Sequence, residues 1–165
     1  MRKSAAAVGA SVFFAVAPGI VAGVVPWWIT GWEMRPFPVA LRVVGAVVLV
    51  AGALVLVDAF MRFVMEGLGT PAPVAPTERL VVGGLYRYVR NPMYLAVVGA
   101  IAGQALLLGQ LGLLLYAALV GVVTAAFVRL YEEPALREQF GAEYEDYRSA
   151  VPGWWPRRRP WAPTR

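Results

Sequence analysis

Three long stretches without a charged residue organise the chain, at 4–32, 43–57 and 91–128. A membrane-spanning helix needs about 20 apolar residues, because each residue advances the helix by about 1.5 Å. The first stretch suffices for one span, and the second suffices once it borrows residues from its flanks. The third exceeds one span and contains the helix-breaking sequence Gly-Gln-Leu-Gly at 109–112, which indicates a tight helical hairpin. The pattern therefore predicts four spans, at about residues 5–26, 39–61, 93–108 and 113–130.

The composition is that of a membrane protein rather than a water-soluble domain. Hydrophobic residues make up 59% of the 165 residues, the mean hydropathy is +0.62, and only 15% of residues are charged. A soluble domain carries roughly 25% charged residues. We therefore expect an all-α integral membrane helical bundle that forms one domain over residues 1–165. The chain has no cysteine and no histidine, which excludes disulfides, zinc sites, haem ligation by these residues and Cys–His or Ser–His nucleophiles, and no metal site is predicted.

The basic residues are distributed unevenly along the chain, whose net charge is +5. With the N-terminus inside, 13 of the 15 lysines and arginines fall on the cytoplasmic side, and only Arg35 and Arg42 fall outside. This asymmetry predicts cytoplasmic N- and C-termini, a cytoplasmic loop over 62–92 and a cytoplasmic tail over 131–165. Small size and an alanine- and valine-rich composition suggest a prokaryotic plasma membrane. Two groups of tryptophans would mark the interfaces, with Trp27, Trp28 and Trp32 outside and Trp154, Trp155 and Trp161 inside.

The first apolar stretch has a second interpretation as a cleaved signal peptide. Arg2 and Lys3 precede it, and Ala-Val-Ala at 15–17 would be the cleavage site. The apolar run exceeds the roughly 7–15 residues of a signal core, and Pro18 would follow the cleavage site. A retained span is therefore the favoured interpretation.

Two pairs of glycines four residues apart, Gly19 with Gly23 and Gly99 with Gly103, allow helices to approach closely. We expect them to pack helices within the bundle rather than to form a dimer. The oligomeric state stays open on sequence alone.

The predicted cytoplasmic segments carry local signals of their own. Pro92 stands where the third span should begin, a position that proline favours, and Asn91 is then the natural N-cap. The tail, with tryptophans and the arginines 157–159, is interpreted as an anchor for anionic lipid, and no nucleic-acid partner is expected. An amphipathic helix on the inner interface is predicted from apolar residues at helical spacing, which are Leu136, Phe140, Tyr144, Tyr147 and Val151.

The charged residues near the span ends each have an ordinary structural interpretation. Glu132 and Glu133 would point about 100° apart on a helix, so both can face one point only if the helix breaks, for example at Pro134. On composition alone we favour an i, i+4 pair between Arg129 and Glu133, with Glu132 in solvent. Arg90 can be one more positive charge on the cytoplasmic side, and Tyr86, Tyr88 and Tyr94 can be aromatic residues at the membrane interface. Asp58 and Arg62 are interpreted as a structural i, i+4 ion pair.

Taken in order along the chain, these residues form a pattern. The sequence GLYRYVRNPMY at 84–94 precedes the apolar hairpin, and Glu132-Glu133 follows it. This order resembles the Arg-His-Pro-x-Tyr … Glu-Glu signature of isoprenylcysteine carboxyl methyltransferases and phospholipid methyltransferases. The segment 140–147, with Phe-Gly-x-x-Tyr-x-x-Tyr, is similar to the C-terminal pattern of the same family. The resemblance runs from about Leu80 to Pro156, nearly half of the chain.

The resemblance implies an S-adenosylmethionine-dependent methyltransferase whose cofactor binds on the cytoplasmic side, between the last two spans and the C-terminal segment. The implied acceptor is lipidic or a small hydrophobic molecule, such as an isoprenylcysteine carboxylate or a phospholipid amine, which enters between helices. Carboxylates can bind the ammonium and ribose of the cofactor, and tyrosine faces can attract its cationic sulfur. No residue is assigned to catalysis. The residues that the resemblance places at the cofactor site are Tyr86, Arg90, Asn91, Pro92, Tyr94, Glu132, Glu133, Tyr144 and Tyr147.

Two positions depart from the family pattern. Asn91 stands in place of the signature histidine, and an amide cannot titrate or act as a general base. Ala96 stands where the isoprenylcysteine enzymes usually carry glycine, which would narrow or alter the pocket. A carboxylate acceptor is ionised at neutral pH and needs no base, whereas an amine or a thiol acceptor must lose a proton.

Two other functions stay open at this point. Sterol reductases share a similar Arg-His-Pro-x-Tyr element, so an NADPH-dependent reductase-like membrane enzyme is one alternative, and a non-catalytic membrane protein that retains the fold is the other. Binding of the nicotinamide cofactor would indicate the first, and binding of neither cofactor the second. If the methyltransferase interpretation holds, Glu133→Gln is expected to weaken cofactor binding and to leave folding intact, because Glu133 is expected at an exposed mouth.

Overall fold

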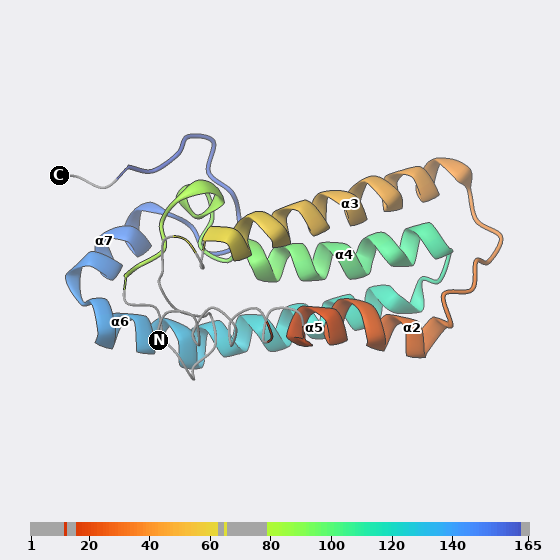
Figure 1. Cartoon of the computed structure of the whole chain (residues 1–165), viewed down its shortest axis with the longest axis horizontal. Helices are drawn as coiled ribbons and strands as arrows, with labels where there is room; N and C mark the ends of the chain where they lie inside the picture. Colours follow the sequence, from red (N-terminus) through yellow and green to blue (C-terminus); the bar gives the residue numbers. More distant parts are fainter. Residues whose placement is uncertain (1–11, 13–15, 63–64, 66–78, 163–165) are drawn as a thin grey trace.

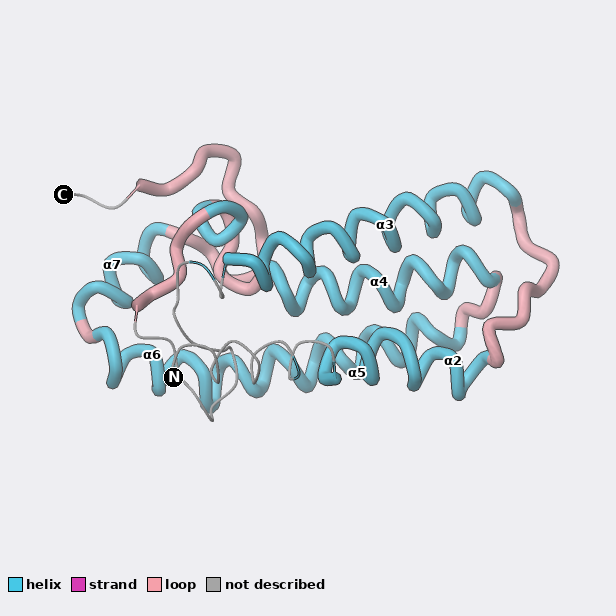
Figure 2. The backbone as a smooth tube through the Cα atoms, in the orientation of Figure 1, coloured by secondary structure: helices cyan, strands magenta, loops and turns pink. Residues whose placement is uncertain are grey.

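The computed structural model describes residues 12, 16–62, 65 and 79–162, and within these residues it contains helices and no strand (Figures 1 and 2). The described part of the first helix, Val16–Thr30, includes a π-helical turn, η1 (Ile20–Val24), and ends as α2 (Val25–Thr30). The other elements in chain order are α3 (Val39–Arg62), a 3₁₀ turn η3 (Gly84–Arg87), α4 (Pro92–Leu108), α5 (Gly112–Phe127), a π-helical turn η4 (Val128–Glu132), α6 (Glu133–Phe140) and α7 (Ala142–Ala150).

Helix α4 lies at the centre of the bundle, in contact with α3, α5 and the first helix (Figure 1). The connections 31–38 and 109–111 lie at one end of the bundle. The 79–91 segment, α6, α7 and the C-terminal tail gather at the other end, which we call the site end. The main hydrophobic core fills the space along α4 and α5, and its buried members are Val97, Ile101, Ala105, Leu108, Leu113 and Ala117.

The outward faces of the long helices are apolar. On α3 the exposed side chains include Val43, Val47, Val50 and Leu54, an arrangement typical of a helix that faces lipid. By length and composition, two helices suffice to cross a membrane, namely Val39–Arg62 and the continuous helix Gly112–Phe140. The first helix and α4 are apolar but shorter. The crossing of the membrane by all four helices therefore stays a prediction.

Most predicted helix bounds agree with the structure. Helix α3 matches the predicted 39–61, and α4 matches the predicted 93–108. The hairpin turns at the predicted tetrapeptide, where Gly109 adopts a left-handed conformation with φ 69° and its hydrogen-bonded turn closes α4. The first helix continues to Thr30, four residues beyond the predicted end.

The helix that carries the predicted fourth span does not end at residue 130 but continues to Phe140, so the end of the span within this helix stays a prediction. Pro134 lies in the first turn of α6 and does not end the helix. Proline has no N–H to donate to a carbonyl of the preceding turn, and the wider π-helical turn η4 accommodates this missing hydrogen bond. The predicted amphipathic helix is in fact two helices. They are separated at Gly141, whose φ of 53° is costly for other residues.

The close approach of α3 and α4 depends on glycines, of which the predicted pairs supply one. A Cβ atom on Gly103 would lie 2.7 Å from the Leu49 nitrogen, and one on Gly45 would lie 2.7 Å from the Gly103 carbonyl oxygen. Gly52 meets α4 in the same way. The prediction that Gly19, Gly23 and Gly99 pack helices together is wrong, because nothing lies within 4 Å of a Cβ atom at any of them.

Three polar side chains, of which Gln104 and Gln110 are buried and Tyr116 is half-buried, attach the first helix to the bundle. A π-helical turn leaves carbonyl groups without their usual helical partners. In η1, the Val21 carbonyl accepts a hydrogen bond of 2.8 Å from the Tyr116 hydroxyl, and the Ala22 carbonyl accepts one of 2.6 Å from Gln104 Nε2. Gln110 Nε2 donates to the Thr30 carbonyl at the far end of the same helix.

Candidate functional site

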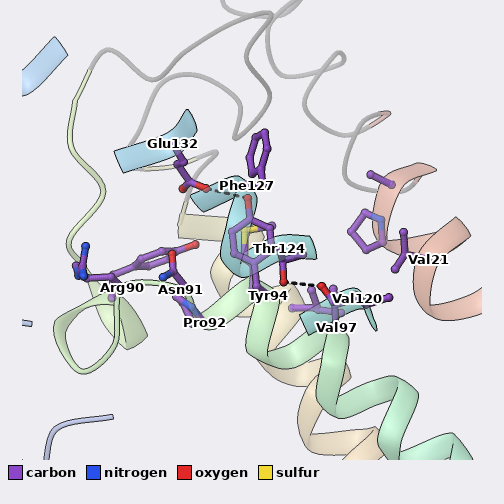
Figure 3. Close-up of a pocket in the computed structure, with 15 residues that line it drawn as sticks. Val21, Arg90, Asn91, Pro92, Tyr94, Val97, Val120, Thr124, Phe127 and Glu132 are labelled. Carbon is purple, nitrogen blue, oxygen red and sulfur yellow. Dashed lines mark hydrogen bonds between the residues drawn. The ribbon is translucent and has the colours of Figure 1, made fainter. Parts of the chain in front are cut away.

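A cavity of about 180 Å³ opens at the site end, where α3 ends and α4 begins (Figure 3). Its lining is mainly apolar and comes from the first helix, α3, α4 and α5, with polar side chains on one side. The polar lining residues are Tyr86, Arg90, Asn91, Tyr94, Thr124 and Glu132, and the apolar ones are Ala17, Pro18, Val21, Leu56, Pro92, Met93, Val97, Val120 and Phe127.

Tyr94 and Glu132 form the polar wall of the cavity. Pro92 starts α4, as predicted, and this places Tyr94 in the first turn of the helix, aimed at the end of η4. The Tyr94 hydroxyl donates a hydrogen bond of 2.9 Å to Glu132 Oε2, which is drawn in Figure 3. The expectation that Glu132 is solvated is therefore wrong, because the carboxylate is partly buried against a tyrosine from another helix.

The next carboxylate along the chain, that of Glu133, belongs to a separate network. Arg90 Nη1 lies 2.7 Å from Glu133 Oε1, and Arg148 Nε lies 3.5 Å from Oε2. The side chains of Arg90 and Glu133 are only 14% and 15% exposed. The expected pair with Arg129 is wrong, since a guanidinium shielded from water attracts a carboxylate more strongly than one on the surface. The premise that Glu133 lies at an exposed mouth is also wrong, because its side chain is largely shielded from water.

Arg90 is held by more than its ion pair. Its Nη1 also donates to the Tyr144 hydroxyl at 3.0 Å, and its Nε donates to the Val151 carbonyl at 2.9 Å. The backbone N–H of Arg90 donates to the Pro152 carbonyl at 3.0 Å. The guanidinium is therefore fixed by α6, α7 and the residue after α7, all of which lie more than 40 positions further along the chain.

Asn91 occupies the N-cap position of α4 but does not cap the helix with its side chain, which corrects the prediction. Instead its Nδ2 donates to the Gly153 carbonyl at 3.1 Å, and its backbone N–H donates to the same oxygen at 3.2 Å. The amide is thus used to hold the C-terminal tail. An amide suits this task because it donates a hydrogen bond at every pH.

The tail continues along the 84–91 segment. The N–H of Arg157 donates to the Tyr88 carbonyl, and Arg87 and Trp161 exchange hydrogen bonds of 2.9 and 2.6 Å. Trp161 packs against Tyr147 with ring centroids 5.3 Å apart, and Trp154 lies 6.5 Å from the Tyr94 ring. Trp155 is exposed, whereas Trp161 is half-buried against Tyr147. The lipid anchoring expected of the tail stays a prediction.

The apolar face of the amphipathic segment is also used within the protein. Tyr144, Tyr147 and Val151 are buried in a cluster with Leu80 and Val82 of the loop before α4. The predicted location of this segment on the membrane interface stays a prediction. What the packing establishes is that this face holds the loop in place beside the cavity.

Three tyrosines at the cavity, of which Tyr86 lines it and Tyr144 and Tyr147 lie behind its wall, remain neutral at physiological pH. The Tyr147 hydroxyl donates a hydrogen bond of 2.7 Å to the Tyr86 carbonyl. Burial raises the pKa of Tyr86, Tyr144 and Tyr147 above the usual value, because removal from water disfavours the phenolate. At neutral pH these hydroxyl groups therefore act as hydrogen-bond donors and acceptors, not as charges.

The nine residues predicted for the cofactor site divide into two layers. Glu133, Tyr144 and Tyr147 lie behind the cavity wall and hold Arg90 and Tyr86. Six of the nine line the cavity itself, namely Tyr86, Arg90, Asn91, Pro92, Tyr94 and Glu132.

Sequence reasoning missed the apolar half of the cavity. Val120, Thr124 and Phe127 follow one face of α5, and their helical spacing could have revealed them. Ala96 is buried on α4 but does not line the cavity; its carbonyl lies against Gly52 of α3. The expectation that Ala96 narrows the pocket is therefore wrong. No cluster of acidic residues that could hold a metal ion occurs among the described residues.

Comparison with known protein families places this arrangement in context. The model of the phospholipid methyltransferase family matches residues 41–143, which include all but the first two residues of α3, the whole of α4 and α5, and the two glutamates. A comparison with curated proteins gives no match. The matched region covers more than half of the chain, and its apolar, lipid-facing helices indicate a membrane location. This protein therefore belongs to the phospholipid methyltransferase family.

Proposed function

We propose that the protein is a membrane enzyme that transfers a methyl group from S-adenosylmethionine to a lipidic or small hydrophobic acceptor. The observation that carries the proposal is the separation of the two glutamates. Glu133 is paired with Arg90 and Arg148, whereas Glu132 keeps its carboxylate at the wall of an apolar cavity, held by Tyr94. Family membership favours methyl transfer over the reductase alternative.

The residues at the polar wall fit the chemistry of the cofactor. S-adenosylmethionine carries an ammonium, a ribose diol and a cationic sulfur. We assign Glu132 to the ammonium or the diol, since a carboxylate forms strong hydrogen bonds to both, and the ring of Tyr94 to the sulfonium. The cavity of about 180 Å³ is smaller than the roughly 300–1,000 Å³ of typical ligand sites, so the proposal places only the sulfonium end of the cofactor inside it.

When bound, S-adenosylmethionine would supply a methyl group on a cationic sulfur, which keeps the bonding electron pair as the acceptor takes the methyl carbon. The protein contributes orientation, exclusion of water and a fixed negative charge beside the cation. For an amine or thiol acceptor, we assign Glu132 to receive the proton that the acceptor loses. A carboxylate acceptor is already ionised and needs no such step.

The distribution of charge supports one orientation of the site in the membrane. Among the described residues, Arg35 and Arg42 lie at the end opposite the site, where Arg42 Nη1 donates to the Leu107 carbonyl. The arginines at the site end include Arg87, Arg90, Arg129, Arg137, Arg148 and 157–159. This supports the proposal that the site faces the cytoplasm, because positive charge accumulates on that side. The proposal of a prokaryotic plasma membrane rests on size and composition alone.

Methyl transfer can be measured with S-adenosylmethionine labelled on its methyl group. The purified protein, in vesicles made from a total lipid extract, is expected to move label into material that extracts into organic solvent, and Glu132→Gln is expected to reduce the rate at least tenfold. Vesicles without protein and vesicles with Glu138→Gln, an exposed carboxylate of α6, are the controls. Label that stays in the aqueous phase with folded protein present would overturn the proposal for membrane lipids.

A further inference from the structure

The end of the C-terminal tail lies along the segment that leads into α4. We call residues 152–161 the distal tail, which forms neither helix nor strand. In the described part of the chain, the backbone–backbone hydrogen bonds of the distal tail all lead to residues 87–91. They run from the N–H of Arg90 to Pro152, of Asn91 to Gly153, of Arg157 to Tyr88 and of Trp161 to Arg87. The position of the distal tail therefore depends on this segment.

The distal tail packs against the polar wall of the cavity from behind. None of its residues lines the cavity, yet three residues that do line it contact the distal tail. Arg90 and Asn91 donate to the two carbonyls just before Trp154. The half-buried Trp154 ring lies 6.5 Å from the Tyr94 ring, centroid to centroid, and is tilted by 40° to it. A shift of the distal tail would therefore disturb the wall without any direct contact between the tail and the cavity.

Asn91 makes the closest connection between the wall and the distal tail. The Gly153 carbonyl oxygen accepts two hydrogen bonds from this one residue, at 3.2 Å from the backbone nitrogen and 3.1 Å from Nδ2. Asn91 is only 6% exposed, so little water competes for these bonds. A Cβ atom at position 153 would lie 3.1 Å from Arg90 Nη2 and 3.5 Å from Asn91 Nδ2. The tail thus approaches the wall this closely at a glycine.

The partner of Asn91 lies outside the part of the chain that matches the family. The match ends at residue 143, so it includes Asn91 but not Gly153. The contact between the two is therefore a feature of this chain that family membership does not supply. An amide neither takes up nor releases a proton near neutral pH, which excludes acid–base chemistry for Asn91 and leaves a geometric role.

From these observations, and resting on the proposed function, we propose that Asn91 is a positioning residue for methyl transfer. It acts through the Gly153 carbonyl, which keeps the distal tail in place and Trp154 against the Tyr94 ring. Tyr94 in turn holds the Glu132 carboxylate at 2.9 Å. The side-chain amide of Asn91 thereby determines, through the distal tail, where the group assigned to the cofactor lies.

The first arm of the test measures the mobility of the distal tail with a nitroxide spin label. The chain has no cysteine, so Trp155→Cys places the label at one position, on a side chain that is 80% exposed. In phosphatidylcholine vesicles at pH 8, Asn91→Leu removes the side-chain donor at similar size and is expected to narrow the spectral lines of a more mobile label. Asn91→His keeps an N–H donor and is expected to retain the wild-type spectrum. A label at Glu143→Cys, exposed on α7, is the control and should not respond.

The second arm measures S-adenosylmethionine binding by calorimetry. Asn91→Leu is expected to bind about fivefold more weakly, the effect of one lost hydrogen bond, and Asn91→His to bind as the wild type does. Because Asn91 itself lines the cavity, Trp154→Leu is the variant that acts only through Tyr94, and it is also expected to weaken binding. Trp155→Leu is the matched control, since its neighbouring ring is exposed, and it should bind normally.

A label as immobile in Asn91→Leu as in the wild type overturns the inference, and so does a mobile tail with unchanged affinity for S-adenosylmethionine. Asn91→Asp, which also has no side-chain donor at pH 8, replaces Asn91→Leu if that variant folds poorly. The two arms separate this inference from the proposed function. A label that Asn91→Leu releases, in a protein whose wild type binds no S-adenosylmethionine, would support the attachment of the tail by Asn91 and contradict the proposed function.

Discussion

Glu132 and Glu133 are adjacent in the sequence, yet their carboxylates bind different partners on either side of the start of α4. Glu132 accepts a hydrogen bond from Tyr94, and Glu133 pairs with Arg90. The π-helical turn η4 ends at Glu132 and α6 begins at Glu133, so a change in helical geometry separates the two side chains. One negative charge is therefore neutralised within the protein, and the other stays at the cavity wall.

This division predicts that Glu132 matters more for the cofactor than for folding. Glu132→Gln keeps the shape of the side chain and removes its charge, so S-adenosylmethionine is expected to bind about 10- to 100-fold more weakly, since hydrogen bonds to charged groups contribute about 1.5–3 kcal/mol. Calorimetric titration measures the affinity, with Glu138→Gln as the control for the loss of an exposed charge on the neighbouring helix. An unchanged affinity in Glu132→Gln would contradict the role of Glu132.

Glu133 is expected to matter for stability. Glu133→Gln leaves the shielded guanidinium of Arg90 without its anion, and breaking such a pair costs about 3 kcal/mol. The matched control is Glu145→Gln, because Glu145 pairs with Arg137 on the surface, where the cost is under about 1 kcal/mol. Unfolding in mixed micelles compares the two variants. Equal losses would show that the Arg90–Glu133 pair is not structural.

The contact between α3 and α4 can be tested with a pair of alanine substitutions on one helix. Gly103→Ala would place a Cβ atom 2.7 Å from the Leu49 nitrogen, and such overpacking costs about 1–3 kcal/mol. Gly99→Ala, one turn away, meets nothing within 4 Å and is expected to be neutral or slightly stabilising. Thermal unfolding in detergent is the measurement, and a Gly99 variant as unstable as the Gly103 variant would contradict the packing described here.

The buried tyrosines predict a specific dependence of stability on pH. The chain has no histidine or cysteine, so the free energy of unfolding is expected to change little between about pH 6 and 9. Above about pH 10 the unfolded chain loses tyrosine protons, whereas Tyr86 and Tyr147, whose pKa values burial raises, keep theirs. Their neutral form therefore stabilises the fold only below that range, and stability falls as the pH rises.

Tyr147→Phe tests this dependence. The variant loses the hydrogen bond to the Tyr86 carbonyl, so at pH 8 it is expected to be about 1 kcal/mol less stable than the wild type. Above pH 10 its stability is expected to fall less steeply, because one buried proton no longer has to be retained. A slope identical to that of the wild type would mean that Tyr147 does not contribute to alkaline unfolding.

The sequence predicted the helices well wherever a strong local signal exists. Charge-free stretches located α3 and α4, and the glycines around Gln110 located the hairpin turn. The helix from Gly112 continues to Phe140, ten residues beyond the predicted span, because the loss of apolar character after residue 128 marks a change of surroundings and not the end of a helix. Gly141 was overlooked because the apolar spacing continues across it.

The candidate site was predicted less completely, for reasons of the same kind. A sequence motif identifies the residues that belong to the site, such as Arg90, Tyr94 and the two glutamates. It does not show which carboxylate meets which partner, because that depends on how α4 and η4 face each other. The role of Asn91 was missed because its partner, the Gly153 carbonyl, is a backbone group far along the chain.

The central claim is that this cavity serves a methyl donor, and the most direct measurement is calorimetric titration of the detergent-purified protein with S-adenosylmethionine, with NADPH as the parallel titrant. We expect saturable binding of S-adenosylmethionine, weakened in Glu132→Gln, and no binding of NADPH. Binding of NADPH alone would contradict the claim and favour a reductase. Binding of neither, by protein shown to be folded, would contradict it in favour of a membrane protein that retains the family fold without its activity.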